Sequence, residues 1–154
     1  MPPPPELVAL ARHIAQGAGL DPALVCAVIE QESAWNPWAI RYEPAFYERY
    51  IAPATGASNP HGSLSESEAR ARAFSWGLMQ VMGQVARENG FKDQFLSVLC
   101  DPEKGIAVGC RVLAKKLAAA GGDATRSLLA WNGGANPAYA QQVLARLSGY
   151  RTSP

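Results

Sequence analysis

The sequence lacks any apolar run of the roughly 20 residues that a membrane-spanning helix needs. Its first residues, Met1 to Glu6, contain neither a basic start nor an apolar stretch, so they predict no secretory signal peptide. Excess charge is also lacking, because 14 lysines and arginines face 13 acidic residues and leave a net charge of +1. We therefore expect no stable insertion into a membrane and no nucleic-acid partner.

Metal-binding and cofactor-binding patterns are absent as well. The three cysteines match neither a paired-disulfide pattern nor a zinc-binding spacing: Cys26 reads as a buried apolar residue, and a disulfide between Cys100 and Cys110 stays open. His13 and His61 have no ligand-type partners at a suitable spacing, and no glycine-rich phosphate loop occurs. The sequence therefore predicts no metal site and no cofactor.

The apolar content suffices for one domain. With 154 residues, 48% of them hydrophobic, the chain predicts a single globular domain over residues 1–154, with a flexible proline-rich arm at residues 1–5. Asp21 and Pro22 mark a helix start, since aspartate caps free amides and proline suits the first helical position. No segment alternates as a half-buried strand does, so we expect an all-α fold of about six to eight helices. The expected helices cover residues 7–17, 22 to about 33, 64–73, 77–88, 102–120, 124–130 and 137–147.

A long segment without a regular pattern separates the second and third of these helices. Residues 36 to about 67 are rich in proline, glycine, tyrosine and serine, with strong breaks at residues 53–56 and 59–62. A loop of this length is uncommon in a compact domain and tends to be functional. We expect it to shape a cleft.

One carboxylate extends an apolar helix face. Val25, Ile29 and Glu32 follow one another at i, i+4 and i+7, and burial of a carboxyl group raises its pKa. A structural interpretation stays open, in which Glu32 caps a neighbouring helix or pairs with an arginine.

Three separated motifs give this carboxylate a context. They are Glu32-Ser33, the run from Ser75 through Gly77-Leu78-Met79-Gln80, and the turn Trp131-Asn132-Gly133-Gly134. In this order and spacing they resemble the lysozyme-like catalytic domain of the soluble lytic transglycosylases, which is marked by a Glu-Ser pair, a Gly-Leu-Met-Gln run and a Tyr-Asn-Gly-Gly or similar turn. The resemblance extends from about Pro22 to Leu144.

The resemblance implies an α-helical lysozyme-like fold with a groove for glycan strands of peptidoglycan, cut at the bond between N-acetylmuramic acid (MurNAc) and N-acetylglucosamine (GlcNAc). It implies that Glu32 is the acid/base residue, which agrees with the need for a carboxylic acid of raised pKa to protonate a poor leaving group. Trp131 stands where the family usually has tyrosine, and Tyr139 is expected to supply a phenol instead. The implied substrate-binding residues are Ser75, Met79, Gln80, Trp131, Asn132 and Tyr139.

The segment after Glu32 departs from the family. Arg41 stands where a transglycosylase commonly has a serine, and the run from Arg41 to Pro44 resembles single-domain bacteriophage endolysins, which include muramidases. A hydrolase usually needs a second carboxylate, for which Glu43 is the first candidate and Glu48 the next. In the alternative interpretation Glu43 pairs with Arg41 or Arg49, and the chain is a lytic transglycosylase that forms 1,6-anhydro products.

Aromatic residues of the loop are candidates for stacking on sugars or for a small satellite core. We expect Trp38 and Tyr50 to pack, and Tyr42 or Tyr47 to reach the groove. The overall expectation is a monomeric endolysin, made in the host cytoplasm and acting on the periplasmic cell wall after release. A non-catalytic glycan-binding or virion structural protein is a more distant alternative, which the buried position of Glu32 disfavours.

Overall fold

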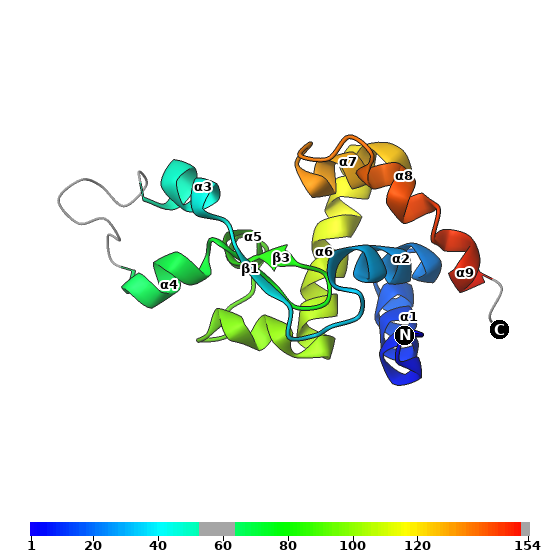
Figure 1. Cartoon of the computed structure of the whole chain (residues 1–154), viewed down its shortest axis with the longest axis horizontal. Helices are drawn as coiled ribbons and strands as arrows, with labels where there is room; N and C mark the ends of the chain where they lie inside the picture. The colour runs from blue at the N-terminus through cyan, green and yellow to red at the C-terminus, as the bar shows by residue number, and fades with distance from the viewer. Residues whose placement is uncertain (53–63, 152–154) are drawn as a thin grey trace.

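The computed structural model describes residues 1–52 and 64–151, and it is mostly helical, as the sequence predicts. Figure 1 shows two parts side by side. Helices α1, α2 and α6 to α9 form one part, and a small sheet with several short helices forms the other. No helix in the described ranges is both long and apolar enough to cross a membrane.

The first two helices pack against each other and carry the catalytic candidate. Helix α1 spans Pro5–Gly17, so it begins inside the expected proline-rich arm. Helix α2 spans Pro22–Ser33, and the Asp21 side chain accepts a hydrogen bond from the Ala23 amide, as the sequence predicts. The seven residues from Ala23 to Ile29 are all buried, which makes α2 the central helix of this part.

The last third of the chain contains four more helices. Helix α6 (Pro102–Ala119) and helix α7 (Ala124–Asn132) begin at Asp101 and Asp123, whose carboxylates accept amide hydrogen bonds of the first turn. Helix α8 (Tyr139–Leu144) is shorter than the helix expected over residues 137–147, and a further helix, α9 (Leu147–Arg151), begins where that helix was expected to end. Both helices pack on α2.

The expectation of no strands is wrong in one place. Strands β1 (Ile40–Tyr42), β2 (Phe74–Trp76) and β3 (Val81–Met82) form an antiparallel sheet in that order, with Arg41 opposite Ser75. Strands of two or three residues are too short to show an alternating pattern, so nothing in the sequence separates them from a loop.

The helix expected over residues 77–88 is consequently shorter. Residues 77–80 form a turn between β2 and β3, in which Gly77 has φ +70° and Gln80 has φ +49°. Helix α5 covers only Gly83–Glu88. Positive φ values are incompatible with a right-handed helix, so the Gly-Leu-Met-Gln run is a turn and not a helix start.

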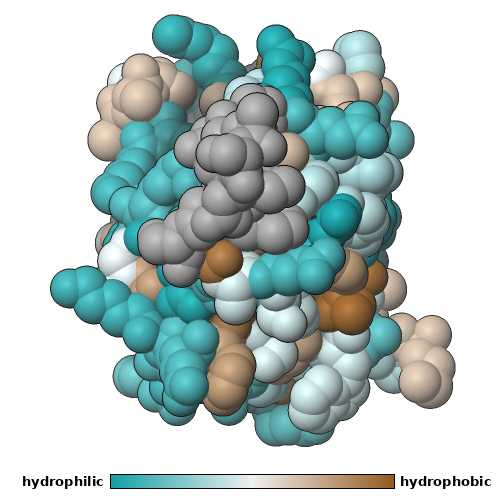
Figure 2. Space-filling view, turned by 90° about the vertical axis from the view of Figure 1, so that its left-hand side faces the viewer, coloured by the Kyte–Doolittle hydropathy of each residue, from teal (hydrophilic) through white to brown (hydrophobic). Residues whose placement is uncertain are grey.

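Short helical pieces occupy the cleft-forming segment and its surroundings. They are α3 (Pro44–Phe46), the π-helix η1 (Tyr47–Ile51), α4 (Glu66–Ala71) and the 3₁₀-helix η3 (Leu96–Cys100). The two strong breaks at residues 53–56 and 59–62 lie outside the described residues. Seen from the end formed by α3 and α4, the surface is mostly hydrophilic (Figure 2), which fits the charged residues of α4.

Two apolar clusters stabilise these parts. The large core joins α1, α2 and α6 to the turn at residues 77–80, and a small second cluster contains Tyr47, Ile51, Ala69 and Ala73. Cys26, Cys100 and Cys110 are buried free thiols. The disulfide between Cys100 and Cys110, which the sequence left undecided, is therefore not formed. Burial raises the pKa of Cys26 to about 11 and that of Cys110 to about 12, which makes these two thiols unreactive near neutral pH.

Candidate active site

The three sequence motifs meet in one groove between the two parts of the molecule. Glu32 comes from the end of α2, Gln80 from the turn after β2, and Trp131 with Asn132 from the end of α7. The groove has a volume of about 430 Å³. Its other lining residues are Arg41, Glu43, Phe46, Ser75, Val81, Met82, Val85, Val112, Lys116, Ala130 and Ala135.

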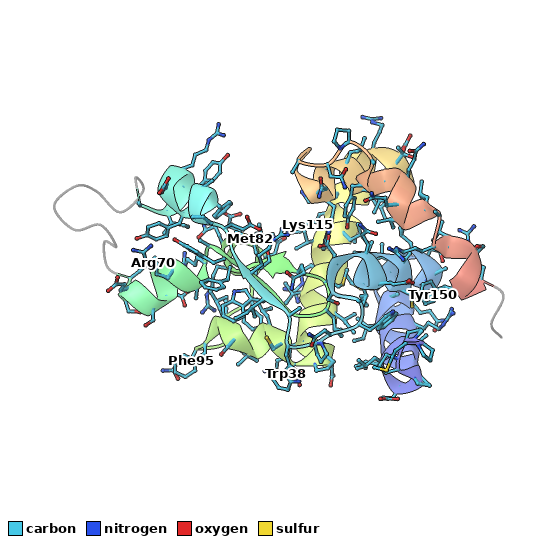
Figure 3. All side chains as sticks on the ribbon, viewed as in Figure 1. Trp38, Arg70, Met82, Phe95, Lys115 and Tyr150 are labelled. Atoms are coloured by element: carbon cyan, nitrogen blue, oxygen red, sulfur yellow. The ribbon has the colours of Figure 1, made fainter. Side chains whose placement is uncertain are left out.

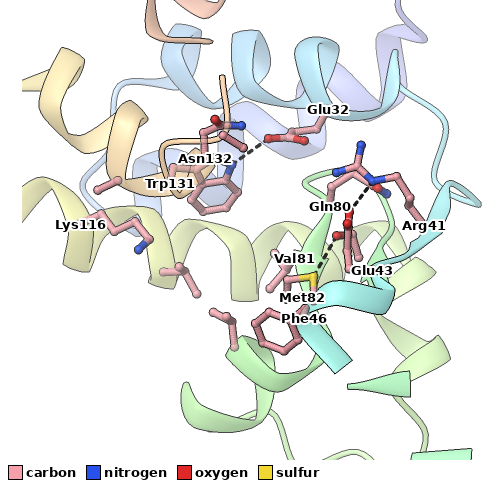
Figure 4. Close-up of a pocket in the computed structure, with 15 residues that line it drawn as sticks. Glu32, Arg41, Glu43, Phe46, Gln80, Val81, Met82, Lys116, Trp131 and Asn132 are labelled. Carbon is pink, nitrogen blue, oxygen red and sulfur yellow. Dashed lines mark hydrogen bonds and ion pairs between the residues drawn. The ribbon is translucent and has the colours of Figure 1, made fainter. Parts of the chain in front are cut away.

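Two neighbouring side chains hold one oxygen of the Glu32 carboxyl group. The Tyr139 hydroxyl donates a hydrogen bond of 2.5 Å to Glu32 Oε1, and the Trp131 indole donates one of 2.9 Å to the same oxygen (Figure 4 draws the second). Glu32 Oε2 accepts no hydrogen bond from the described residues. The residue therefore has a fixed orientation and keeps one oxygen available to a ligand in the groove.

Burial dominates the electrostatics of Glu32. Desolvation raises the pKa of its carboxyl group, and the hydrogen bonds from Tyr139 and Trp131 and the charge of Arg41 offset only part of this rise. The same burial, together with the nearby Glu32, raises the pKa of Tyr139, so its phenol stays protonated and acts as a donor. A carboxyl group in this setting keeps its proton to a higher pH than an exposed glutamate.

Ser33 explains why the Glu-Ser pair and the Gly-Leu-Met-Gln run occur together. Its hydroxyl lies 2.8 Å from the Leu78 carbonyl oxygen and 3.1 Å from the Ile29 carbonyl oxygen. A hydroxyl has one proton, so it donates to these two acceptors in turn or shares the proton between them. This contact fixes the end of α2, and with it Glu32, against the turn that carries Gln80.

Gln80 is fixed by the same turn. Its amide nitrogen donates hydrogen bonds of 2.9 Å to the carbonyl oxygens of Ala39 and Gly77. These bonds leave the side-chain carbonyl oxygen of Gln80 without a partner among the described residues. Since Gln80 lines the groove, this oxygen is placed to accept a hydrogen bond from a ligand.

Asn132 stabilises the wall beside Trp131. Its side-chain oxygen accepts a hydrogen bond of 2.7 Å from the Asn136 amide, and Gly133 ends α7 in the left-handed conformation with φ +72°. Glycine adopts this conformation without steric cost, which accounts for the Asn-Gly-Gly sequence. The turn holds Trp131 over Glu32.

Glu43 and Arg41 form an ion pair on the opposite wall. Arg41 Nε lies 2.6 Å from Glu43 Oε1, and both residues line the groove with Glu32 (Figure 4). The pairing with Arg41 that the sequence left open is therefore present. A role of Glu43 as second carboxylate stays a prediction.

Of the remaining site candidates, Met79 and Tyr139 lie outside the groove lining and Ser75 is part of it. Met79 is fully buried, and its side chain occupies the space beside Gly109, where a Cβ would lie 2.4 Å from the Met79 sulfur. Ser75 lines the groove, and its hydroxyl donates to the Met82 sulfur at 3.1 Å. Tyr139 is 3% exposed, so it acts from behind Glu32.

The loop aromatics are arranged differently from the expectation. Tyr47 is buried and Tyr42 packs against it, with Arg70 donating to the Tyr42 hydroxyl at 3.0 Å and lying 4.0 Å from the Tyr47 ring centroid. Trp38 and Tyr50, which were expected to pack, are 76% and 53% exposed. The small satellite core that the sequence left open is therefore present around Tyr42 and Tyr47. Its contact with Arg70 was not predictable from local sequence, because Arg70 lies 28 residues after Tyr42 and 23 residues after Tyr47.

Sequence reasoning did not select several groove residues, among them Phe46 and Lys116. Phe46 lines the groove from α3, and Lys116 lines it from α6. The position of Lys116 four residues after the buried Val112 was the available sign, because residues at this spacing share a helix face. The described residues contain no group of three or more His, Cys, Asp or Glu side chains placed to bind a metal ion.

A comparison with protein families identifies the chain. The family model described as the transglycosylase SLT domain matches residues 9–146, which include every groove residue. The chain belongs to the transglycosylase SLT domain family. This SLT domain is accordingly an enzyme, a peptidoglycan glycosidase of the lytic transglycosylase or lysozyme-like kind. No solved structure matches the chain.

Proposed function

We propose that this SLT domain cleaves the β-1,4 bond between MurNAc and GlcNAc in peptidoglycan, with Glu32 as the general acid. The observation that carries the proposal is the setting of the Glu32 carboxyl group, in which two donors bind one oxygen while burial raises the pKa. Cleavage of a glycosidic bond requires a proton on the leaving oxygen, and a protonated carboxylic acid at a fixed position supplies it. Glu32 Oε2 is the atom that delivers the proton.

The groove lining suits a sugar chain. Trp131 and Phe46 offer aromatic surface on the two sides of the groove, and Gln80 offers a hydrogen-bond acceptor near Glu32. Apolar ring faces pack on aromatic side chains, whereas hydroxyl and N-acetyl groups need polar partners. This combination supports a glycan as the ligand.

The second step of the reaction has two candidate courses. Our first proposal is hydrolysis, in which Glu43 activates water or stabilises the developing cation, and the presence of Glu43 in the same groove as Glu32 favours it. The second is attack by the sugar's own hydroxyl, which yields a 1,6-anhydro product. The ion pair of Glu43 with Arg41 favours this course, because a neighbouring cation weakens a carboxylate as a base.

Mass spectrometry of the muropeptides released from purified peptidoglycan tests the proposal. Products with a reducing MurNAc establish hydrolysis, and Glu43→Gln should then lower their rate of release by at least about 10²-fold. Products lighter by one water establish the transglycosylase course, and Glu43→Gln should then retain activity. Release of neither product from intact peptidoglycan refutes the proposal.

We also propose a biological role as a bacteriophage endolysin. The support is the resemblance of the run from Arg41 to Pro44 to such enzymes, together with the peptidoglycan specificity of the family. Expression of the chain in a bacterial cytoplasm should leave cells intact until a membrane lesion is opened, and should then cause lysis. Intact cells after the lesion, with active enzyme inside, would contradict this role.

A further inference from the structure

The groove contains one cation without a carboxylate partner. Of its four charged or titratable side chains, Arg41 and Glu43 neutralise each other, and Glu32 is uncharged in its proton-donating form. Lys116 makes no ion pair or hydrogen bond with any residue of the described ranges. The groove of the working enzyme therefore has a net positive charge that belongs to Lys116.

Lys116 lies at a distinct place in the groove. Figure 4 shows it on α6 beyond Trp131, at the opposite end of the groove from Arg41. It follows the buried Val112 by one helical turn, and Ala130 of the neighbouring α7 lines the same groove. These neighbours offer no acceptor side chain, so the ammonium group depends on solvent or on a bound ligand for its hydrogen bonds.

The adjacent lysine provides a comparison. Lys115 is exposed on another face of α6, where its amine donates a hydrogen bond of 2.8 Å to the Asn89 side chain. Lys115 also lines a separate depression with residues of α1, and it does not line the groove. A charge effect that depends on the groove must therefore come from Lys116 and not from Lys115.

The substrate has one class of anion to offer. Where the peptide stems are attached, the sugar backbone of peptidoglycan is uncharged, because the lactyl carboxyl group of MurNAc is in amide linkage to the stem. The stems themselves carry carboxylates. We propose that Lys116 binds a carboxylate of a peptide stem, so that the enzyme prefers glycan strands whose stems retain free carboxylates. This inference rests on the proposed function, because it assumes that a glycan strand occupies the groove beside Glu32.

A purely structural role of Lys116 makes a different prediction. The aliphatic part of a lysine often covers apolar surface while its amine stays in water. In that case, replacement changes cleavage of every glycan strand to the same extent. Strands that differ only in the charge of their stems therefore distinguish the two roles.

The test measures KM and kcat on two matched substrates. One is a preparation of soluble, uncrosslinked glycan strands, freed of phosphate-containing wall polymers with hydrofluoric acid, and the other is the same preparation with its stem carboxylates converted to amides. We expect Lys116→Gln to raise KM about 10-fold on the carboxylate strands, the loss of roughly 1.4 kcal/mol of binding, with kcat within about twofold. On the amidated strands the variant and the wild type should match. Lys116→Arg should restore most of the affinity, and Lys115→Gln should behave as wild type on both substrates.

Three outcomes overturn the inference while leaving the proposed function intact. They are an equal loss on both substrates, no loss on either, and a loss that appears only before the phosphate polymers are removed. The last result would identify phosphate as the bound anion. Failure of the wild-type enzyme to cleave either substrate would instead refute the proposed function.

Discussion

At the scale of single residues, the site depends on the balance between burial and hydrogen bonding at Glu32. Burial favours the protonated carboxyl group, and the donors Tyr139 and Trp131 favour the carboxylate. Both donors bind Oε1, so they orient the group and leave Oε2 without a hydrogen bond from the described residues. Trp131 stands where the family usually has tyrosine, and its indole N–H donates to Glu32.

Removal of one donor should change the pH dependence of the reaction. A general acid works while it is protonated, so activity falls as the pH rises through the Glu32 pKa. Tyr139→Phe removes a bond that stabilises the carboxylate, which raises this pKa further. We expect the alkaline limb of the kcat/KM profile to move to higher pH, with a loss of about tenfold on the plateau from poorer orientation. Glycan cleavage measured across a pH series tests this.

A second tyrosine serves as the control for this experiment. Tyr150 donates a 2.6 Å hydrogen bond to Glu30, in a network outside the groove that also includes Trp35. Figure 3 shows Tyr150 far from Met82, which marks the groove. Tyr150→Phe should leave the alkaline limb in place. An alkaline limb of Tyr139→Phe that stays in place or moves to lower pH would contradict the role assigned to this hydroxyl.

The sequence predicted the catalytic candidate better than it predicted its surroundings. Glu32 was identifiable because it extends a helical apolar stripe, and a helix has a fixed period. The sequence predicted the same substrate-binding role for Met79 and Gln80, yet Met79 is in the core and Gln80 is in the groove. The left-handed conformation of Gln80 reverses the expected direction of its side chain, and no local pattern predicts a positive φ at glutamine.

At the scale of elements, the turn between β2 and β3 connects the two walls of the groove. The Leu78 carbonyl oxygen of this turn accepts a hydrogen bond from the Ser33 hydroxyl of α2. The Gly77 amide of the turn donates to the Ala39 carbonyl oxygen at 2.8 Å. Gly77 also lies against η3, where a Cβ would be 2.4 Å from the Leu99 carbonyl oxygen. The position therefore needs glycine both for its conformation and for the close approach of two backbones.

A pair of substitutions separates these two requirements. Gly77 and Gly121 both have positive φ values, +70° and +63°, but a Cβ at Gly121 meets nothing within 4 Å. We expect Gly121→Ala to lower the free energy of unfolding by about 1 kcal/mol. Gly77→Ala should lower it by about 3 kcal/mol, because the contact with Leu99 forces the backbone to move. Urea unfolding of both variants measures the difference, and equal losses would contradict a close approach at Gly77.

Long helices with clear starts were predictable, and the small sheet was not. Asp21, Asp101 and Asp123 each precede a helix and cap it, so α2, α6 and α7 begin close to where the sequence places them. The pairing of β1 with β2 joins residues more than 30 positions apart, such as Ile40 with Trp76. A strand of three residues has too little sequence of its own to indicate such a pairing.

At the scale of the whole molecule, the shape of the groove depends on the stability of the part that contains the small sheet, because this part forms one of the groove walls. Glu68 of α4 holds this part together, since its carboxylate accepts hydrogen bonds from Arg72 and from Arg87 of α5. Arg87 in turn donates to the carbonyl oxygens of Phe91 and Asp93. One carboxylate thus links α4, α5 and the segment that follows α5.

The cluster of Glu68, Arg72 and Arg87 should make the free energy of unfolding depend on pH in the acidic range. Burial raises the Glu68 pKa, but the bonds from Arg87 and Arg72 outweigh it and hold the pKa below its usual value. A carboxyl group with a lowered folded-state pKa contributes stability above its unfolded pKa of about 4.3, and the contribution is lost as the pH falls through the folded-state pKa. Glu68→Gln should lower the free energy of unfolding by about 2 kcal/mol at pH 7 and flatten its decline below about pH 4.

Thermal or urea unfolding between pH 2 and 7 checks this expectation. Glu66→Gln removes a charge from the same helix and serves as the matched control, because Glu66 forms no ion pair within the described residues. The Glu66→Gln curve should follow that of the wild type. A Glu68→Gln curve parallel to the wild type at every pH would show that the cluster does not contribute to acid sensitivity.

The central claim is that this SLT domain cleaves peptidoglycan through the acid function of Glu32, and the rate of muropeptide release by Glu32→Gln tests it most directly. Glu30→Gln is the matched control, because Glu30 lies on the same helix and pairs with Arg146 outside the groove. With both variants shown to be folded by circular dichroism, Glu32→Gln should lose activity by about 10²- to 10⁴-fold or more, and Glu30→Gln should stay within about tenfold of wild type. Full activity of folded Glu32→Gln would contradict the assignment.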